Sequence, residues 1–289
     1  MYLEKEALDY FRKYDTLKYF LAFPFLNLSG EIPSRRLGQN LEFEQYREYI
    51  PGDEIRNLDW KVLARSGKAF IKNYGSDINT SVSIILDNSL SMDFPQNHDS
   101  KLEVSKKIIA ILSYLLLKKK NKVSLGIINE NYQEMGSIQY NNLERLLSRI
   151  KAQNKTNPLN IPSRANKEIT FLISDGWWKS TELKDILSHL IVNQIHLIHI
   201  LSPEEIELNW SGYFELIDSE SNKKLNIIPS EIRDSYQKKI KERITLFRQT
   251  LTEKKILYGT FPLNIPYYVN LRNFMDLLIH RIKIKRNIT

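Results

Sequence analysis

Three oxygen-bearing side chains stand at alternate positions in the segment Asp87-Asn88-Ser89-Leu90-Ser91. A carboxylate and two hydroxyls on one short loop can place three oxygen atoms around a single point. Hard divalent cations take oxygen ligands, and Mg²⁺ requires a near-octahedral set at about 2.0–2.1 Å while it usually keeps several waters. One carboxylate leaves such an ion under-neutralised, so the pattern predicts a site that accepts an acidic group from outside.

The D-x-S-x-S spacing also has an ordinary structural explanation, because Asp and Ser are common at helix N-caps and in turns. Two further features favour a metal site. The apolar run at residues 169–174 ends in Asp175-Gly176, and Thr156 lies on the connection between the two carboxylates. The candidate ligands are therefore Asp87, Ser89, Ser91, Thr156 and Asp175, for Mg²⁺ or alternatively for Mn²⁺ or Ca²⁺.

A parallel sheet would bring these residues together. Strands alternating with helices are typical of a three-layer α/β domain with a mostly parallel sheet and helices on both faces. In such sheets ligands bind beyond the carboxyl ends of the strands, where Asp87 and Asp175 are expected. Apolar runs predict strands at 82–86, 123–128, 169–174, 195–201 and 256–260, and helical spacing predicts helices at 101–117, 143–150, 182–192, 230–255 and 269–282.

The first 78 residues differ from the rest in composition and in their pattern of apolar residues. They begin with a helical stretch and turn aromatic and charge-dense, with Pro51-Gly52-Asp53 as a turn. Alternating apolar and polar residues over 69–74 predict short strands. We therefore expect an N-terminal helix plus a β-rich extension at 1–78, and an α/β domain at 79–289.

Composition excludes several classes of protein. The 289 residues contain no Cys, which rules out disulfides, thiolate metal sites and cysteine nucleophiles. Neither the nucleotide-binding glycine patterns nor G-x-S-x-G is present. The longest apolar run, residues 108–117, is far shorter than the roughly 20 residues of a spanning helix, and the N-terminus lacks a signal peptide's apolar stretch. We expect a soluble, cytoplasmic protein.

Two sets of residues resemble known families. The five candidate ligands resemble the metal-ion-dependent adhesion site of von Willebrand factor A domains. Residues 44–53 (EQYREYIPGD), 55–60 (IRNLDW) and 64–67 (ARSG) resemble the signature of the bacterial domain-of-unknown-function-58 family, and 201–205 (LSPEE) is similar to its carboxyl half. This resemblance implies a Rossmann-like von Willebrand factor A domain with a β-rich N-terminal extension. It also implies association with MoxR-type AAA+ ATPases in chaperone or assembly work, without established catalysis.

Two groups of residues near these motifs have open roles. Trp177 and Trp178 follow Asp175 and either pack inward as core or form an exposed anchor for a partner. The signature contributes charges around an aromatic residue: Arg47, Asp53, Arg56, Asp59, Trp60 and Arg65. Their signs balance, which favours a structural ion-pair network over a surface for a partner or a nucleic acid.

The sequence thus predicts a non-catalytic, metal-dependent protein-interaction module. Asp87, Ser89 and Ser91 would bind the ion directly, Thr156 and Asp175 directly or through water, and an Asp or Glu of a partner would complete the coordination. A MoxR-type AAA+ ATPase or its client is the expected partner.

Two rival classes are weaker. A phosphohydrolase needs a general acid where Ser89 stands, two residues after the attacking carboxylate. The net charge of +8 would suit a nucleic-acid-binding protein, but the basic tail at 281–286 lacks interleaved aromatic residues. The identity of the partner, the metal and the oligomeric state stay open.

Overall fold

The chain forms two compact units, Pro24–Asn79 and a larger one made of Met1–Phe23 and Thr80–Thr289. The computed structural model describes residues 2–12, 41–49, 58–76, 81–118, 120–153, 169–178, 194–219, 221–254 and 256–286. Thr156, Asp53, Arg56 and the helix predicted at 182–192 lie outside these ranges.

The first helix, α1 (Lys5–Arg12), belongs to the larger unit, whereas the sequence grouped it with the extension. The residues just before α1 make polar contacts with the larger unit. The Glu144 carboxylate accepts hydrogen bonds from the backbone N–H groups of Tyr2 and Leu3 at 2.9–3.1 Å. The hydroxyl of Tyr267 donates to Glu4 at 3.0 Å. These contacts tie the first residues to the α/β unit.

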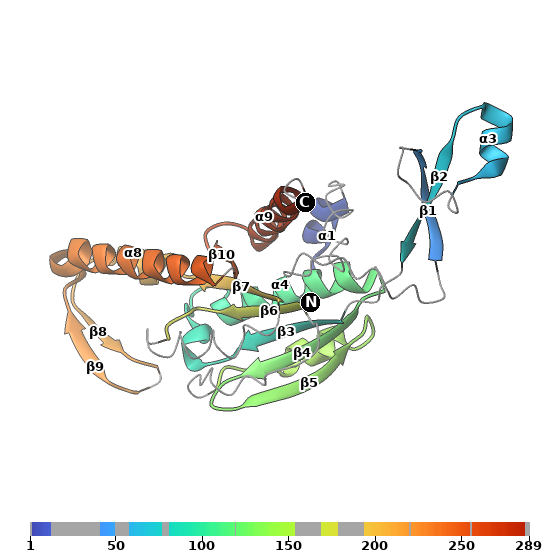
Figure 1. The fold of residues 1–289 in the computed structure, drawn as a ribbon. Helices are drawn as coiled ribbons and strands as arrows, with labels where there is room; N and C mark the ends of the chain where they lie inside the picture. The colour runs from blue at the N-terminus through green and yellow to red at the C-terminus, as the bar shows by residue number, and fades with distance from the viewer. Residues whose placement is uncertain are drawn as a thin grey trace. The chain divides into compact units, whose positions relative to one another are not determined.

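A six-stranded sheet forms the centre of this unit, with the order β10-β7-β6-β3-β4-β5 (Figure 1). All neighbours run parallel except β5, which is antiparallel to β4. A mostly parallel sheet of this kind confirms the predicted α/β class. The strands are β3 (Ser81–Asp87), β4 (Lys122–Ile128), β5 (Tyr132–Ile138), β6 (Ile169–Ser174), β7 (Gln194–Leu201) and β10 (Leu257–Pro262).

Helices cover both faces of the sheet, as the alternation of side chains along β10 shows. Tyr258 contacts Phe247 of α8 (Pro229–Glu253) with ring centroids 5.7 Å apart. On the opposite face, Phe261 contacts Phe274 of α9 (Tyr267–Arg286), also at 5.7 Å. Gly259 shares that face, and a Cβ there would lie 2.3 Å from the Phe274 ring, so only glycine allows this approach.

Two further helices, α4 and α7, begin near the edge of the sheet where Asp87 and Asp175 lie. α4 (Lys101–Lys118) packs against α9 and β4, and most of its residues are buried. Its N-terminus is capped by Ser100, whose hydroxyl accepts a hydrogen bond from Glu103 N–H at 3.3 Å. α7 (Pro203–Glu207) follows β7 after Ser202. Within the described residues, the other elements of this unit are η3 (Leu90–Asp93), α5 (Leu143–Arg149), and the hairpin of β8 (Phe214–Ile217) and β9 (Lys224–Ile227).

The smaller unit contains an antiparallel pair, β1 (Leu41–Glu48) and β2 (Phe70–Ser76), and the short helix α3 (Trp60–Ser66). Asp59 caps α3 by accepting hydrogen bonds from the N–H groups of Lys61 and Val62 at 2.9 and 3.2 Å. Arg47 lies on β1 opposite Ile71. Trp60 and Arg65 are exposed on α3. At Asp59 the signature therefore has a structural role as a helix cap.

Among the described helices, none has both the length and the apolar character needed to cross a membrane.

Candidate metal centre

The four candidate ligands that the structure describes, Asp87, Ser89, Ser91 and Asp175, lie at the switch point of the sheet. The chain leaves β3 towards β4 on one side, whereas it leaves β6 towards β7 on the other, although β3 and β6 are neighbours. Leu86 of β3 pairs with Ile173 of β6 in parallel register, so Asp87 and Asp175 leave the sheet at the same edge. Open α/β sheets bind ligands at this position, outside the carboxyl ends of the strands.

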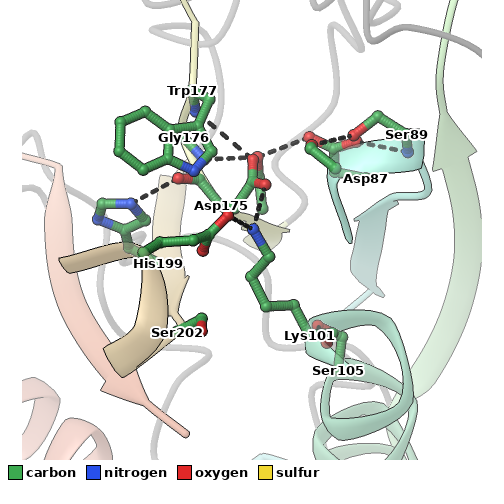
Figure 2. Close-up of polar contacts among 12 residues, drawn as sticks. Asp87, Ser89, Lys101, Ser105, Asp175, Gly176, Trp177, His199 and Ser202 are labelled. Atoms are coloured by element: carbon green, nitrogen blue, oxygen red, sulfur yellow. Dashed lines mark hydrogen bonds and ion pairs between the residues drawn. The ribbon is translucent and has the colours of Figure 1, made fainter. Parts of the chain in front are cut away.

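Asp87 is fixed from both sides of this edge. Its Oδ1 accepts a hydrogen bond from Ser89 N–H at 3.0 Å, and its Oδ2 accepts one from the hydroxyl of Ser174 at 2.6 Å. Ser174 in turn accepts from Gly176 N–H at 3.0 Å. The Asp87 carboxylate is 1% exposed. Figure 2 shows it between the loop that carries Ser89 and the end of β6.

The hydroxyls of Ser89 and Ser91 lie side by side at the end of β3. Their Oγ atoms are hydrogen bonded to each other at 3.0 Å. Adjacent ligands of an octahedral Mg²⁺ with bonds of about 2.0–2.1 Å at right angles are about 2.8–3.0 Å apart. The two oxygens therefore match one edge of such an octahedron. Ser91 reaches this position because η3 begins at Leu90 and turns the chain back.

The loop after β3 is also tied to the chain that leads to Thr156. Asn88 donates from Nδ2 to Lys151 O at 2.9 Å, and Gln153 N–H donates to Asn88 O at 2.8 Å. Gln153 precedes Thr156 by three residues. Thr156 itself lies outside the described residues, so its role as a ligand stays a prediction.

Asp175 has a different environment, because a buried lysine contacts it. Lys101 Nζ lies 2.8 Å from Asp175 Oδ2 and 2.6 Å from Glu205 Oε1, and its side chain is 0% exposed (Figure 2). Burial lowers the pKa of Lys101, but the two carboxylates outweigh burial and the net shift is upward. Lys101 therefore carries its positive charge. An ion that took Asp175 as a direct ligand would share that carboxylate with an ammonium group.

A buried histidine supports the backbone of Asp175. His199 Nε2 is 2.7 Å from Asp175 O, and Nδ1 is 2.6 Å from the hydroxyl of Tyr258. Burial lowers the pKa of His199 to about 4, so the ring is neutral at pH 7. A carbonyl only accepts, so Nε2 donates to Asp175 and Nδ1 accepts from Tyr258. Gly176 has a φ of +65°, and a Cβ added there would lie 3.0 Å from His199 Nε2.

The two tryptophans after Asp175 have separate roles. Trp178 is 7% exposed and belongs to the buried core with Phe247, so its predicted role as an exposed anchor is wrong and the core alternative holds. The ring of Trp177 is only partly buried and lies under the guanidinium of Arg243, 5.0 Å from the ring centroid. Trp177 is the one of the pair that a partner can reach.

Sequence reasoning missed the charged residues around Asp175. Lys101 is the first residue of α4, where the helix dipole favours an anion over a cation. A lysine at a helix N-terminus was only a weak signal, because its cost of less than about 1 kcal/mol does not by itself require carboxylates nearby. Within the described ranges, no three His, Cys, Asp or Glu side chains are grouped to hold a metal. A metal here would depend on the serine hydroxyls.

Comparisons with known proteins place the chain in a family. The family described as "Protein of unknown function DUF58" matches residues 45–245. BatB from Bacteroides thetaiotaomicron, a conserved hypothetical protein, is similar at 14% identity and a TM-score of 0.41, over 72% of this chain and 99% of that one. A von Willebrand factor type A protein from Catenulispora acidiphila shows 14% identity and a TM-score of 0.37, over 72% and 43%.

An aerotolerance-related membrane protein from Bacteroides fragilis is similar at 15% identity and a TM-score of 0.42, over 68% of this chain and 98% of that one. No curated protein sequence matches the chain. Identities and TM-scores of this size say nothing about what the chain binds.

Proposed function

The chain belongs to the DUF58 family of proteins of unknown function, and from that premise we propose that it is a protein-interaction module that binds a partner's carboxylate through a divalent cation. The cation would lie at the switch point, at the ends of β3 and β6. Asp87, Ser89 and Ser91 would hold it. The observation that carries the proposal is the 3.0 Å separation of the two serine oxygens beside Asp87.

Three of the proposed ligands suit Mg²⁺ or Mn²⁺ by their chemistry. One carboxylate and two hydroxyls are hard oxygen ligands, and a site of this kind retains waters that an incoming ligand can replace. When bound, the ion supplies a positive charge that an external carboxylate can ligate. Asp175 would act through water, because its Oδ2 contacts Lys101 at 2.8 Å. Thr156 stays a proposed ligand of the same ion.

We propose no catalytic role for this site. A phosphoryl-transfer enzyme with Asp87 as its nucleophile would need a general acid nearby. Ser89, two residues along the chain, cannot take this role, and its N–H is hydrogen bonded to Asp87 itself. Asp175, the carboxylate at the end of the neighbouring strand, pairs with Lys101.

The proposed partner contributes an Asp or Glu, and Trp177 provides apolar contact beside it. A MoxR-type AAA+ ATPase, or a protein on which it acts, is our candidate, and it rests on the family resemblance alone. Trp is enriched at binding hot spots, and Trp177 is partly exposed. Trp177 lies two residues after Asp175, next to the proposed ion site.

The test measures binding of Mn²⁺ to the full chain by isothermal titration calorimetry, with Asp87→Ala and Asp93→Ala as a matched pair. Asp93 is exposed on η3, so its loss removes the same charge from the same loop without touching the site. Binding should vanish in Asp87→Ala and persist in Asp93→Ala. Circular dichroism checks that both variants are folded. Equal binding by both variants would refute the proposal.

The partner is tested separately with purified MoxR-type AAA+ ATPase from the same organism. Complex formation should be lost in EDTA, restored by Mg²⁺ and weakened by Trp177→Ala. A complex that survives both EDTA and Asp87→Ala would refute metal-dependent binding of this partner.

A further inference from the structure

A fixed positive charge lies inside the candidate centre. Lys101 has a fully buried side chain, and its ammonium group bridges Asp175 on the loop after β6 and Glu205 on α7. Figure 2 shows the side chain rising from α4 to the Asp175 carboxylate. Asp87, on the neighbouring strand, accepts its hydrogen bonds from Ser89 and Ser174 instead. The two carboxylates of the switch point thus have different partners.

The position of Lys101 in its helix makes this arrangement specific. It is the first residue of α4, where the backbone N–H groups already concentrate positive charge. A lysine there needs two carboxylates at 2.6–2.8 Å to compensate for burial and for the helix dipole. Ser105 fixes the first turn by donating from its hydroxyl to Lys101 O at 2.7 Å. The ammonium group is held at one place.

We propose that Lys101 sets the charge of the metal site by keeping Asp175 away from the ion. The inference rests on the proposed function and names the residue that makes the site depend on a partner. With Asp175 bound to Lys101, the ion has one carboxylate ligand and a nearby positive charge. It binds weakly on its own and retains enough positive charge to take an external carboxylate.

The expected size of the effect follows from electrostatics. A unit charge several ångströms from a divalent cation changes its binding by more than about tenfold, even at an effective dielectric constant of about 20. Removing the ammonium group should also release Asp175 to replace a water on the ion. Removing the Glu205 charge should act in the opposite direction, because Lys101 would then be less neutralised and would pair with Asp175 alone.

The experiment uses Mn²⁺ as the probe and the full chain with three variants. Lys101→Met keeps the side-chain length without the charge, and Glu205→Gln removes the opposing charge. Lys107→Met is the matched control. Lys107 lies on the same helix as Lys101 and also pairs with two carboxylates, those of Glu4 and Asp99. Affinity is measured by electron paramagnetic resonance, and the number of waters on Mn²⁺ by water-proton relaxation.

Lys101→Met should bind Mn²⁺ at least about tenfold more tightly than the natural chain and with fewer waters. Glu205→Gln should bind more weakly, and Lys107→Met should be unchanged. Lys101→Met with unchanged affinity and water number would overturn the inference. If that variant does not fold, Glu205→Gln decides, and an affinity equal to or above that of the natural chain would overturn it.

The outcomes separate this inference from the proposed function. Binding by Lys101→Met alone, with none in the natural chain, would support the role of Lys101 and overturn the proposed function. Binding by the natural chain that Lys101→Met does not strengthen would overturn only the role of Lys101. The absence of binding in every variant would overturn both.

Discussion

The two strands that border the switch point end in different surroundings. After β3, the polar groups are a carboxylate and two hydroxyls on one loop, with Ser91 partly exposed. After β6, Asp175 is surrounded by Lys101, Glu205 and the neutral ring of His199, all mostly buried. The β3 side carries neutral hydroxyls beside its carboxylate, and Ser91 reaches the surface, whereas the β6 side holds a buried ion pair and a neutral histidine.

This difference separates binding from stability at one edge of the sheet. Groups paired in the interior are costly to break, because removing one partner leaves the other buried and uncompensated. The partly exposed hydroxyl of Ser91 can be removed at little cost to the fold, whereas Asp87 is buried. Substitutions on the β6 side should therefore change stability first, and substitution of Ser91 on the β3 side should change binding first.

The largest expected effect is that of Lys101→Ala. It leaves the buried carboxylate of Asp175 and the partly buried one of Glu205 without their ammonium partner, which should lower the free energy of unfolding by about 3–5 kcal/mol. Urea denaturation in EDTA measures this change. Lys107→Ala is the control, because its two partners are 34% and 54% exposed and such pairs contribute about 0–1 kcal/mol. An equal decrease in the free energy of unfolding of both variants would contradict the view that the β6 side stabilises the fold.

Gly176→Ala should have the next largest effect. Alanine at φ +65° costs about 1–2 kcal/mol in the backbone, and its Cβ would meet His199 Nε2 at 3.0 Å. Displacing the ring weakens its hydrogen bond to Asp175 O and adds about 1 kcal/mol.

Gly212→Ala in the same unit is the control for Gly176→Ala. Gly212 also has a positive φ, of +108°, but nothing lies within 4 Å of its Cβ position. Thermal unfolding compares the two variants. A melting temperature lowered equally in both would show that the contact with His199 adds nothing.

The sheet could be predicted because its buried parallel strands are short apolar runs. The run predicted at 82–86 is β3, Ser81–Asp87, and the run at 169–174 is β6 with the same bounds. β5 was missed because its residues, YQEMGSI, lie at the sheet edge and show no strong apolar pattern. The hairpin β8–β9 was missed because strands of four residues are too short to give a pattern.

The β3 side of the site could be predicted from the sequence, whereas the contacts of the β6 side could not. Asp87, Ser89 and Ser91 stand at alternate positions of one five-residue segment, so their spacing already predicts convergent oxygens. Lys101, Asp175 and Glu205 come from α4, the loop after β6 and α7, and are joined only by the folding of the sheet. No spacing in the sequence records such a contact. Trp178 was likewise undecided, because only the position of α8 shows that core covers it.

A pH dependence tests whether the β6 side is held by a neutral histidine. The pKa of His199 is about 4 in the folded chain and 6.5 without the fold, so the unfolded chain binds more protons between these values. Stability from this group is complete above pH 6.5 and is lost as the pH falls towards 4. At pH 5 the loss should be about 2 kcal/mol. Urea denaturation at pH 7.5 and 5 measures it, and His199→Gln should lack this part of the decrease; an equal decrease in the variant would contradict the prediction.

The smallest effect on stability should come from Ser91→Ala, on the β3 side. Ser91 is partly exposed and its described contact is with the hydroxyl of Ser89, so the free energy of unfolding should change by less than about 0.5 kcal/mol. The affinity of this variant for Mn²⁺ should nevertheless fall by at least about tenfold, since Ser91 is a proposed ligand and even groups that only orient ligands contribute about 10–100-fold. Ser148→Ala, on an exposed face of α5, should change neither quantity. Calorimetric titration with Mn²⁺ beside urea denaturation separates the two readouts. A stability loss as large as that of Lys101→Ala, or an unchanged affinity, would show that the two sides of the switch point are not divided between binding and stability.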